Sequence, residues 1–173
     1  MNTSSSAQPG SPYRNRKQNR FHADREAERA EEQFRRLAVP QALMMQAGIQ
    51  VSTIARPGSV HLQQDEPQYS VITSFDTSAH AYVCTAYFPM TFHTDDLGAL
   101  LSLANGRNAH NSFARVLVQS EGDQARICAE TLLIARAGVS EAQLLAFFGA
   151  SQRAFRDVAA HIEELTDGVK AAK

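Results

Sequence analysis

The histidines and cysteines are the side chains of this sequence that could bind a metal ion or attack a substrate. They are His22, His61, His80, His93, His110, His161, Cys84 and Cys128. Metal-binding sequences usually place ligands in closely spaced pairs, and no two of these histidines have such a spacing. His80 and His93 flank one expected strand and would meet only if the fold brought its two ends together. We expect no metal and no other cofactor.

Nucleophilic and nucleotide-dependent catalysis are also poorly supported. Cys84 lies in the middle of an apolar run, which favours a packed thiol over a reactive one. Phosphate-binding loops need several glycines around a strand-to-helix turn. Gly98 and Gly106 instead fall within or at the end of an expected helix, and Gly138 has no partner glycine. We therefore expect no catalytic residues and no enzymatic activity.

Three asparagines gather near the end of an expected helix, namely Asn105, Asn108 and Asn111. Their amides could bind a polar ligand. Asparagine also caps helices and tolerates left-handed backbone, and the sequence favours this structural role.

A basic run near the start of the chain raises an alternative function. Its charges are Arg14, Arg16, Lys17 and Arg20, and Tyr13 and Phe21 flank them. Such residues could contact phosphates and stack on bases, so a nucleic-acid-associated regulator is the alternative hypothesis. The run is short, however, and passes directly into acidic residues. The net charge of the chain is −1, which provides no overall field for nucleic acid or anionic lipid.

The sequence indicates a cytoplasmic protein without membrane contact. No apolar stretch approaches the roughly 20 residues that cross a bilayer. The first ten residues lack the hydrophobic core of a signal peptide, and two cysteines in apolar runs do not resemble a secreted disulfide scaffold.

The chain divides into four expected segments. Residues 1–23 form a disordered basic head, and residues 24–37 form a charged helical extension with a thin apolar stripe. Residues 38–168 form the folded body, and residues 169–173 form a tail. Pro40 is expected to separate the charged helix from a short second helix.

Alternating apolar residues and turn signals predict the strands of the body. The expected strands are 49–56, 69–76, 80–88, 113–119 and 125–135. Pro89 should end the third of these. Residues 59–67 are the least clear segment and could form an edge strand. A short connection containing Gly122 predicts a hairpin between the last two strands.

Two further helices are expected, over residues 94–108 and from Ser140 to Leu165. Ser140 and Gln143 form a capping box at the start of the last helix. Because the strands occur in hairpins, the sequence predicts an α+β fold with an antiparallel sheet of about five strands flanked by helices, in the order α-β-β-β-α-β-β-α.

Aromatic residues are the candidate interface of this fold, because they are more numerous than three helices need to cover. The candidates are Tyr69, Phe75, Tyr82, Tyr87, Phe88, Phe92 and Phe113. They could equally belong to the core. If helices cover one face of the sheet, some of these side chains could bind a partner on the other.

Several positions in the second half of the chain form a recognisable pattern. They are Leu103-Ala104-Asn105 with Asn108, the strand residues Phe113 and Glu130, and Gly138-Val139-Ser140-Glu141. In these positions and in its order of elements, the chain resembles the YbjN family of bacterial sensory transduction regulators over residues 38–165. The resemblance implies a fold like that of type III secretion chaperones, self-association, and a non-enzymatic role as regulator or chaperone-like adaptor. Residues 49–68 match no pattern of the family, and the helix at 24–37 is additional.

Together these features predict a protein-binding domain that forms a homodimer and holds a protein partner of unknown identity. Binding of nucleic acid is the less favoured hypothesis.

Overall fold

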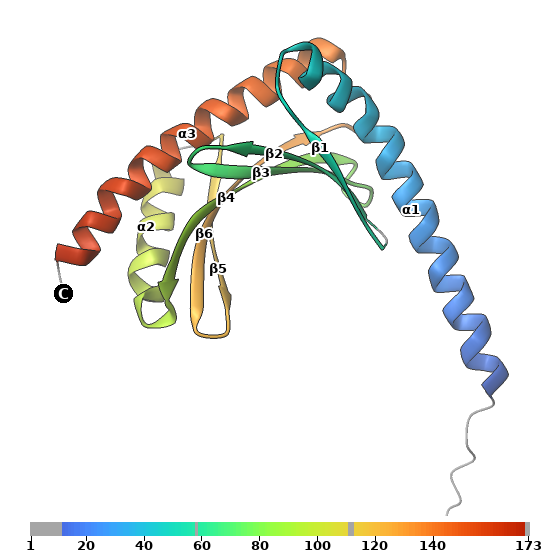
Figure 1. The fold of residues 1–173 in the computed structure, drawn as a ribbon, viewed down its shortest axis with the longest axis horizontal. Coiled ribbons are helices and arrows are strands. Elements are labelled where there is room, and N and C mark those ends of the chain that lie inside the picture. Colours follow the sequence, from blue (N-terminus) through green and yellow to red (C-terminus); the bar gives the residue numbers. More distant parts are fainter. Residues whose placement is uncertain (1–11, 58, 111–112, 172–173) are drawn as a thin grey trace, which may run out of the picture.

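The computed structural model describes residues 12–57, 59–110 and 113–171, with side chains described for 22–57, 59–110 and 113–162. Its elements are α1 (Pro12–Gln46), β1 (Ser52–Arg56), β2 (Ser59–Glu66), β3 (Tyr69–Asp76), β4 (Ala81–His93), the 3-10 turn η1 (Thr94–Asp96), α2 (Leu97–His110), β5 (Arg115–Glu121), β6 (Gln124–Ile134) and α3 (Glu141–Ala171). Figure 1 shows a curved sheet lying beneath two long helices.

The strands form one antiparallel sheet in the order β1-β2-β3-β4-β6-β5. The predicted α+β class and antiparallel sheet are confirmed, but the sheet has six strands instead of about five. The additional strand is β2, which the sequence left unclear. Val60, Leu62 and Gln64 alternate on its buried side, and a polar Gln64 at an inward position weakens the apolar alternation that normally marks a strand.

The predicted helix break at Pro40 is wrong, because α1 is continuous from Pro12 to Gln46. A proline inside a helix lacks the N–H that would bond to the carbonyl four residues earlier. That carbonyl belongs to Arg36, and the hydroxyl of Tyr82 donates to it at 3.1 Å. Residues 12–23, predicted as disordered, also belong to this helix, while residues 1–11 lie outside the described residues.

The predicted end of the strand at Pro89 is wrong, because β4 continues to His93. The register with β6 shifts between Tyr87 and Thr91, so that Phe88, Pro89 and Met90 lie in a bulge. The pairing of β4 with β3 already ends at Tyr87. A proline is tolerated here because a bulge at an unpaired edge requires no N–H from it.

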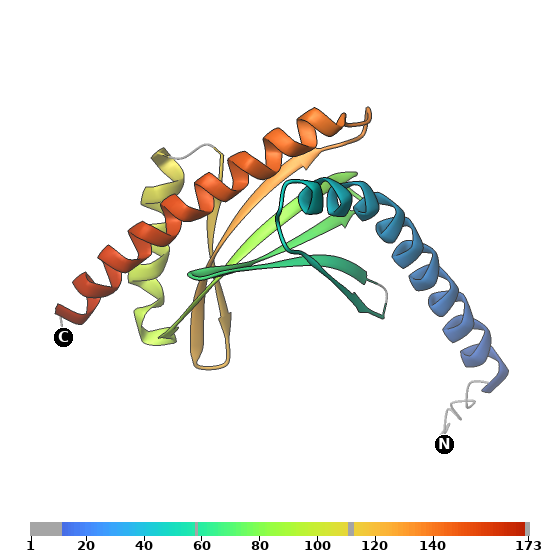
Figure 2. The ribbon, with the colours of Figure 1, turned by 45° about the horizontal axis from the view of Figure 1, so that its top comes forward.

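The core lies between the sheet and the helices α1 and α3, which cover the same face of the sheet (Figures 1 and 2). The capping box of α3 is confirmed, since Ser140 N–H donates to Gln143 Oε1 at 2.9 Å and Gln143 N–H to Ser140 Oγ at 3.2 Å. The predicted stripe of α3 is buried at Leu144, Phe148, Ser151, Phe155, Val158 and Ile162. The side chain of Leu165 lies outside the described part.

The last helix is longer than predicted, since residues 169–171 continue α3 instead of forming a tail. Within the described residues, no helix combines the length and apolar character that crossing a bilayer requires.

Candidate functional site

The seven candidate aromatics do not gather on one surface. Four of them, Tyr69, Phe75, Tyr82 and Phe88, are buried in the core between the sheet and the helices. Phe92 is partly buried against that core. Tyr87 and Phe113 are 37% and 44% exposed, so these two keep side-chain surface that a partner could contact.

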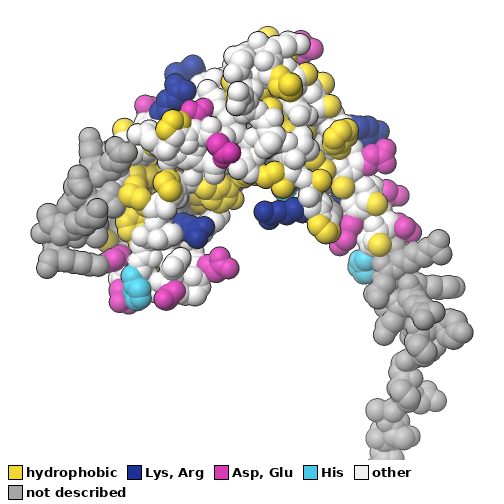
Figure 3. All heavy atoms as spheres, in the orientation of Figure 1, with side chains coloured by type: hydrophobic (Ala, Val, Ile, Leu, Met, Phe, Trp, Pro, Cys, Tyr) yellow, Lys and Arg dark blue, Asp and Glu magenta, His cyan; other side chains and the backbone are white. Residues whose placement is uncertain are grey.

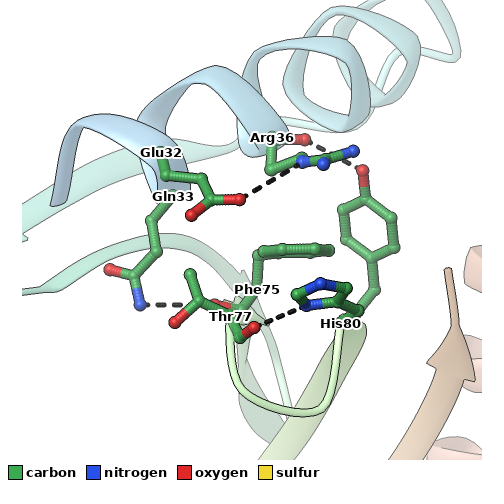
Figure 4. A network of polar contacts seen from close by, with 7 residues as sticks. Glu32, Gln33, Arg36, Phe75, Thr77 and His80 are labelled. Carbon is green, nitrogen blue, oxygen red and sulfur yellow. Dashed lines mark hydrogen bonds and ion pairs between the residues drawn. The ribbon is translucent and has the colours of Figure 1, made fainter. Parts of the chain in front are cut away.

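Packing of α1 onto the β3–β4 hairpin explains why the core takes up two of these aromatics. The guanidinium of Arg36 lies 5.2 Å from the centre of the Phe75 ring, and Phe75 meets Tyr82 edge to face at 5.0 Å. Gln33 joins two strands to the helix, since its amide donates to Phe75 O at 3.2 Å and accepts from Val60 N–H at 3.0 Å. Figure 4 shows Gln33 and Arg36 reaching from the helix to this hairpin. These contacts fix α1 on one face of the sheet.

The other face of the sheet is not covered by the long helices (Figures 1 and 2). Burial alternates along β3 and, except at the buried Cys128, along β6, so that every second residue points away from the helices. One row across this open face contains His61, Ser74, Val83 and Leu132, which are register partners on four strands. Leu132 is 50% exposed. We call this surface the open face.

Apolar side chains occur along the whole open face. They are Ile54, Ile72, Val83, Tyr87, Leu117, Leu132 and Ile134. Ile134 is 65% exposed. Figure 3 shows hydrophobic and polar side chains mixed on the concave lower side of the molecule. Large exposed aliphatic residues in one surface are characteristic of a docking site when they are contiguous.

One end of the open face is acidic. Tyr87 and Arg126 line two adjoining hollows of about 560 and 400 Å³. Glu121 and Asp123 lie at the wall of the larger hollow, and Asp65 and Glu66 lie at the wall of the smaller one. Burial and the neighbouring Cys128 and Glu130 raise the pKa of Tyr87, and a tyrosine phenol is neutral near pH 7 in any case. This end therefore offers a neutral ring surrounded by more carboxylates than cations.

Both cysteines are buried and carry no disulfide, as predicted. Burial raises the pKa of Cys84 to about 12, although hydrogen bonds with Thr73 and Thr131 lower it. Burial and nearby Glu130 raise the pKa of Cys128 to about 11. Thiols that hold their protons so firmly are poor nucleophiles at neutral pH.

Cys84 belongs to a row of polar groups inside the core. Thr73 Oγ1 lies 3.3 Å from Cys84 Sγ, and Thr131 Oγ1 lies 2.8 Å from Ser151 Oγ. Ser151 also donates to Phe147 O at 2.9 Å. The row connects the sheet to α3 and satisfies its own hydrogen bonds, which indicates a structural role.

The six histidines belong to six different segments of the fold. No group of three or more His, Cys, Asp or Glu side chains suited to a metal ion occurs among the described residues. His80 Nδ1 donates to Thr77 O in the β3–β4 turn, and His93 Nδ1 accepts from Asp95 N–H at 3.3 Å. Burial and the charge of Arg56 lower the pKa of His61 on the open face.

One asparagine of the predicted cluster, Asn108, has a structural role. The Asn108 amide donates to Val116 O at 2.9 Å and accepts from Val116 N–H at 2.7 Å. It thereby pairs with the backbone of β5, an edge strand, as a neighbouring strand would. Asn105 is exposed, and Asn111 lies outside the described residues.

Sequence reasoning missed the aliphatic part of the open face. Leu132 and Ile134 were assigned to a strand but not to an interface. The alternation along the strand could have identified them, because Leu132 and Ile134 alternate with Thr131 and Leu133 and therefore face the side opposite to the core.

The body of the chain matches a known family. A sequence profile for YbjN, described as "Putative bacterial sensory transduction regulator", matches residues 41–164. The match confirms the resemblance inferred over residues 38–165 and begins inside α1. A comparison with curated proteins finds no match.

A solved structure has the same fold. It is the crystal structure of YbjN from E. coli, described as "a putative transcription regulator", with a TM-score of 0.62 and 11% sequence identity. The alignment covers 74% of this chain and 91% of that chain. At this identity the likeness concerns the fold alone.

Proposed function

The chain belongs to the YbjN family of bacterial sensory transduction regulators, and on that premise we propose that it regulates by binding another protein. The binding surface is the open face of the sheet, and the domain also self-associates. The protein has no catalytic activity of its own. The observation that carries the proposal is the pair of exposed aliphatic side chains, Leu132 and Ile134, on a sheet face that the long helices leave uncovered.

The side chains of the open face indicate which residue types a partner would present to it. Its apolar end, around Leu132 and Ile134, would bury aliphatic side chains of the partner. Its acidic end, around Tyr87, would attract Lys or Arg side chains. We therefore propose that the occupant is an amphipathic protein segment with aliphatic residues toward one end and basic residues toward the other.

Nucleic acid fits the open face less well. The carboxylates of Asp65, Glu66, Glu121 and Asp123 would repel phosphates. The basic residues 14–20 are followed directly by five acidic residues within 24–32. A phosphate backbone lying along α1 would therefore meet both signs of charge.

The proposal is tested with two leucine variants of similar exposure. Leu132 on the open face is 50% exposed, and Leu101 on α2 is 44% exposed. The full chain and the variants Leu132→Glu and Leu101→Glu are used to capture proteins from bacterial cells, and each captured protein is quantified. We expect at least one protein that the wild type and Leu101→Glu capture in equal amounts and that Leu132→Glu captures about tenfold less or not at all. Equal capture by all three chains would contradict it.

A further inference from the structure

β1 is an edge strand of the sheet and lies next to β2. Its residue Ala55 is the register partner of Val60 on β2. The N–H of Val60 donates to Gln33 Oε1 at 3.0 Å and so does not bond to Ala55. In an antiparallel ladder, the residues of such a pair point their backbone groups away from each other, and the same holds two residues further along. The N–H and C=O groups of Ala55 and Thr53 therefore point outward from the edge of the sheet.

The edge formed by β1 has few of the features that protect edge strands from pairing. Proteins usually shield an edge with charged side chains, a bulge or a covering segment. Thr53 and Ala55 are small and exposed, and the register with β2 is regular over residues 52–56. At the other edge of the sheet, the Asn108 amide already occupies the outward backbone groups of Val116 on β5. β1 is therefore the edge better suited to accept another strand.

An exposed flank of α1 lies on the same side as this edge. The guanidinium of Arg36 contacts Phe75 on β3, and α1 lies over β2 and β3. Phe34 is two residues before Arg36, about 200° around the helix axis, so it faces the opposite way, toward β1. Phe34 is 56% exposed and Met45 is 62% exposed. Figure 3 shows hydrophobic side chains at the surface along α1. The uncharged residues that recur along this flank at steps of four and three are Phe34, Ala38, Gln41 and Met45.

The edge of β1 is complementary to itself. A two-fold axis would pair β1 with the β1 of a second copy in antiparallel orientation. With the axis at Ile54, Thr53 of each copy lies opposite Ala55 of the other, and their outward N–H groups meet outward C=O groups. Ile54 then lies opposite itself. Arg56 lies opposite Ser52, so the pairing does not bring the two arginines together.

We propose that two copies of this chain pair through their β1 edges, antiparallel and centred on Ile54, with the exposed flanks of the two α1 helices on the same side of the junction. Strands of five residues bury little area by themselves, and the apolar flanks around Phe34 and Met45 add to the contact. Ile54 belongs to the row of His61 on the open face, so the two open faces become one continuous surface. The inference rests on the proposed function, because it names the surface of the self-association proposed there.

Removal of one outward N–H tests the strand pairing in the full chain. Ala55→Pro removes an outward N–H at the junction and leaves the bonds from β1 to β2 in place. Ser120→Pro is the matched control on β5, since Ser120 lies four residues after Val116 and its N–H also points outward. Sedimentation equilibrium measures the dissociation constant of the dimer, and urea unfolding verifies that each variant folds. We expect a dimeric wild type, a dissociation constant raised by about tenfold or more in Ala55→Pro, and no change in Ser120→Pro.

A charge exchange at Ile54 tests the position of the axis, and it remains informative if Ala55→Pro fails to fold. In Ile54→Lys or Ile54→Glu, like charges meet across the junction, so each variant alone should dimerise about tenfold more weakly or not at all. An equimolar mixture should form a heterodimer with an affinity near that of the wild type, because opposite charges then meet. The same exchange at Leu101 on α2, which is 44% exposed, should leave the dimer unchanged.

A monomeric wild type at about 100 µM, a dimer that Ala55→Pro leaves unchanged, or a mixture of Ile54 variants that associates no more tightly than its components would each overturn the proposal. So would an Ala55→Pro chain that stays dimeric but no longer captures a protein, because the edge would then hold a strand of that protein. Capture through Leu132 is measured separately. A dimer that is insensitive to Ala55→Pro would exclude this surface and leave the proposed function standing.

Discussion

The hydroxyl of Tyr82 donates a hydrogen bond to the backbone carbonyl of Arg36 at 3.1 Å. This carbonyl lies four residues before Pro40, which has no N–H to give it. A side chain from β4 thus takes the place of a missing bond inside α1. The same helix lies over β2 and β3, so this contact helps to hold α1 on the covered face of the sheet.

Replacement of Tyr82 by phenylalanine should lower the free energy of unfolding by about 1–2 kcal/mol, because a partly buried carbonyl loses its donor. In a Pro40→Ala background, the helix supplies the N–H itself, and the cost of Tyr82→Phe should fall by at least half. Urea unfolding of the four chains measures this coupling. Tyr87→Phe, at an exposed phenol, is the control and should change stability by less than about 0.5 kcal/mol. Equal costs of Tyr82→Phe in both backgrounds would show that the two residues are independent.

Asn108→Ala should destabilise the protein by about 1–3 kcal/mol, because both backbone groups of Val116 lose their partner at the edge of the sheet. Asn105→Ala, three residues earlier on the same helix and exposed, should have little effect. Thermal or urea unfolding of both variants measures the difference. If the two substitutions had the same effect, the pairing of α2 with β5 would contribute nothing to stability.

The buried thiols predict a loss of stability at high pH. In the folded protein the pKa of Cys84 is about 12 and that of Cys128 is about 11, against an ordinary value of 9.0. Above about pH 9, the unfolded chain therefore releases these protons while the folded chain keeps them. Their stabilising contribution is complete below pH 9 and is lost as the pH rises toward the folded values.

The measurement is the free energy of unfolding between pH 8 and about 10.5, for the wild type and for Cys84→Ala. The wild type should lose stability over this range, and the variant should lose it less steeply, by up to about 1.4 kcal/mol per pH unit. The raised pKa values of Tyr69 and Tyr82 act in the same direction above pH 10. A slope that Cys84→Ala does not alter would mean that this thiol ionises equally in both states.

Leu132→Glu should leave the fold intact, because half of the side chain already lies in solvent. We expect a change in the free energy of unfolding of less than about 1 kcal/mol. Phe75→Ala, at a residue that is 1% exposed in the core, should cost about 3–5 kcal/mol. Urea unfolding measures both variants. A large loss of stability in Leu132→Glu would place this residue in the core instead of on a docking surface.

Local patterns predicted most of the fold because the decisive signals lie within one element. The apolar stripe and the Ser140–Gln143 box identify α3, and the alternation in β3 identifies a half-buried strand. The errors occurred where a distant group changes the rule for one residue. Pro40 stays in a helix because Tyr82 lies beside it in space, and Pro89 stays in a strand because β3 does not extend beside it. Neither relationship can be read from neighbouring residues.

The candidate surface was predicted less well than the fold, because aromatic character does not say which face of a sheet a residue occupies. Phe75 and Tyr82 are in the core under α1, whereas the aliphatic Leu132 and Ile134 are exposed on the other side. The choice depends on which face the helices cover, and the amphipathic pattern of a helix does not specify that face.

The most direct test of protein binding by the open face is cross-linking from a defined position in the living cell. A photoreactive amino acid replaces Leu132 on the open face or, in a separate chain, Leu101 on α2. We predict that irradiation produces an adduct with one distinct protein from position 132 and not from position 101. Absence of a protein adduct at position 132, or the same adduct from both positions, would contradict the claim that this face of the sheet holds the partner.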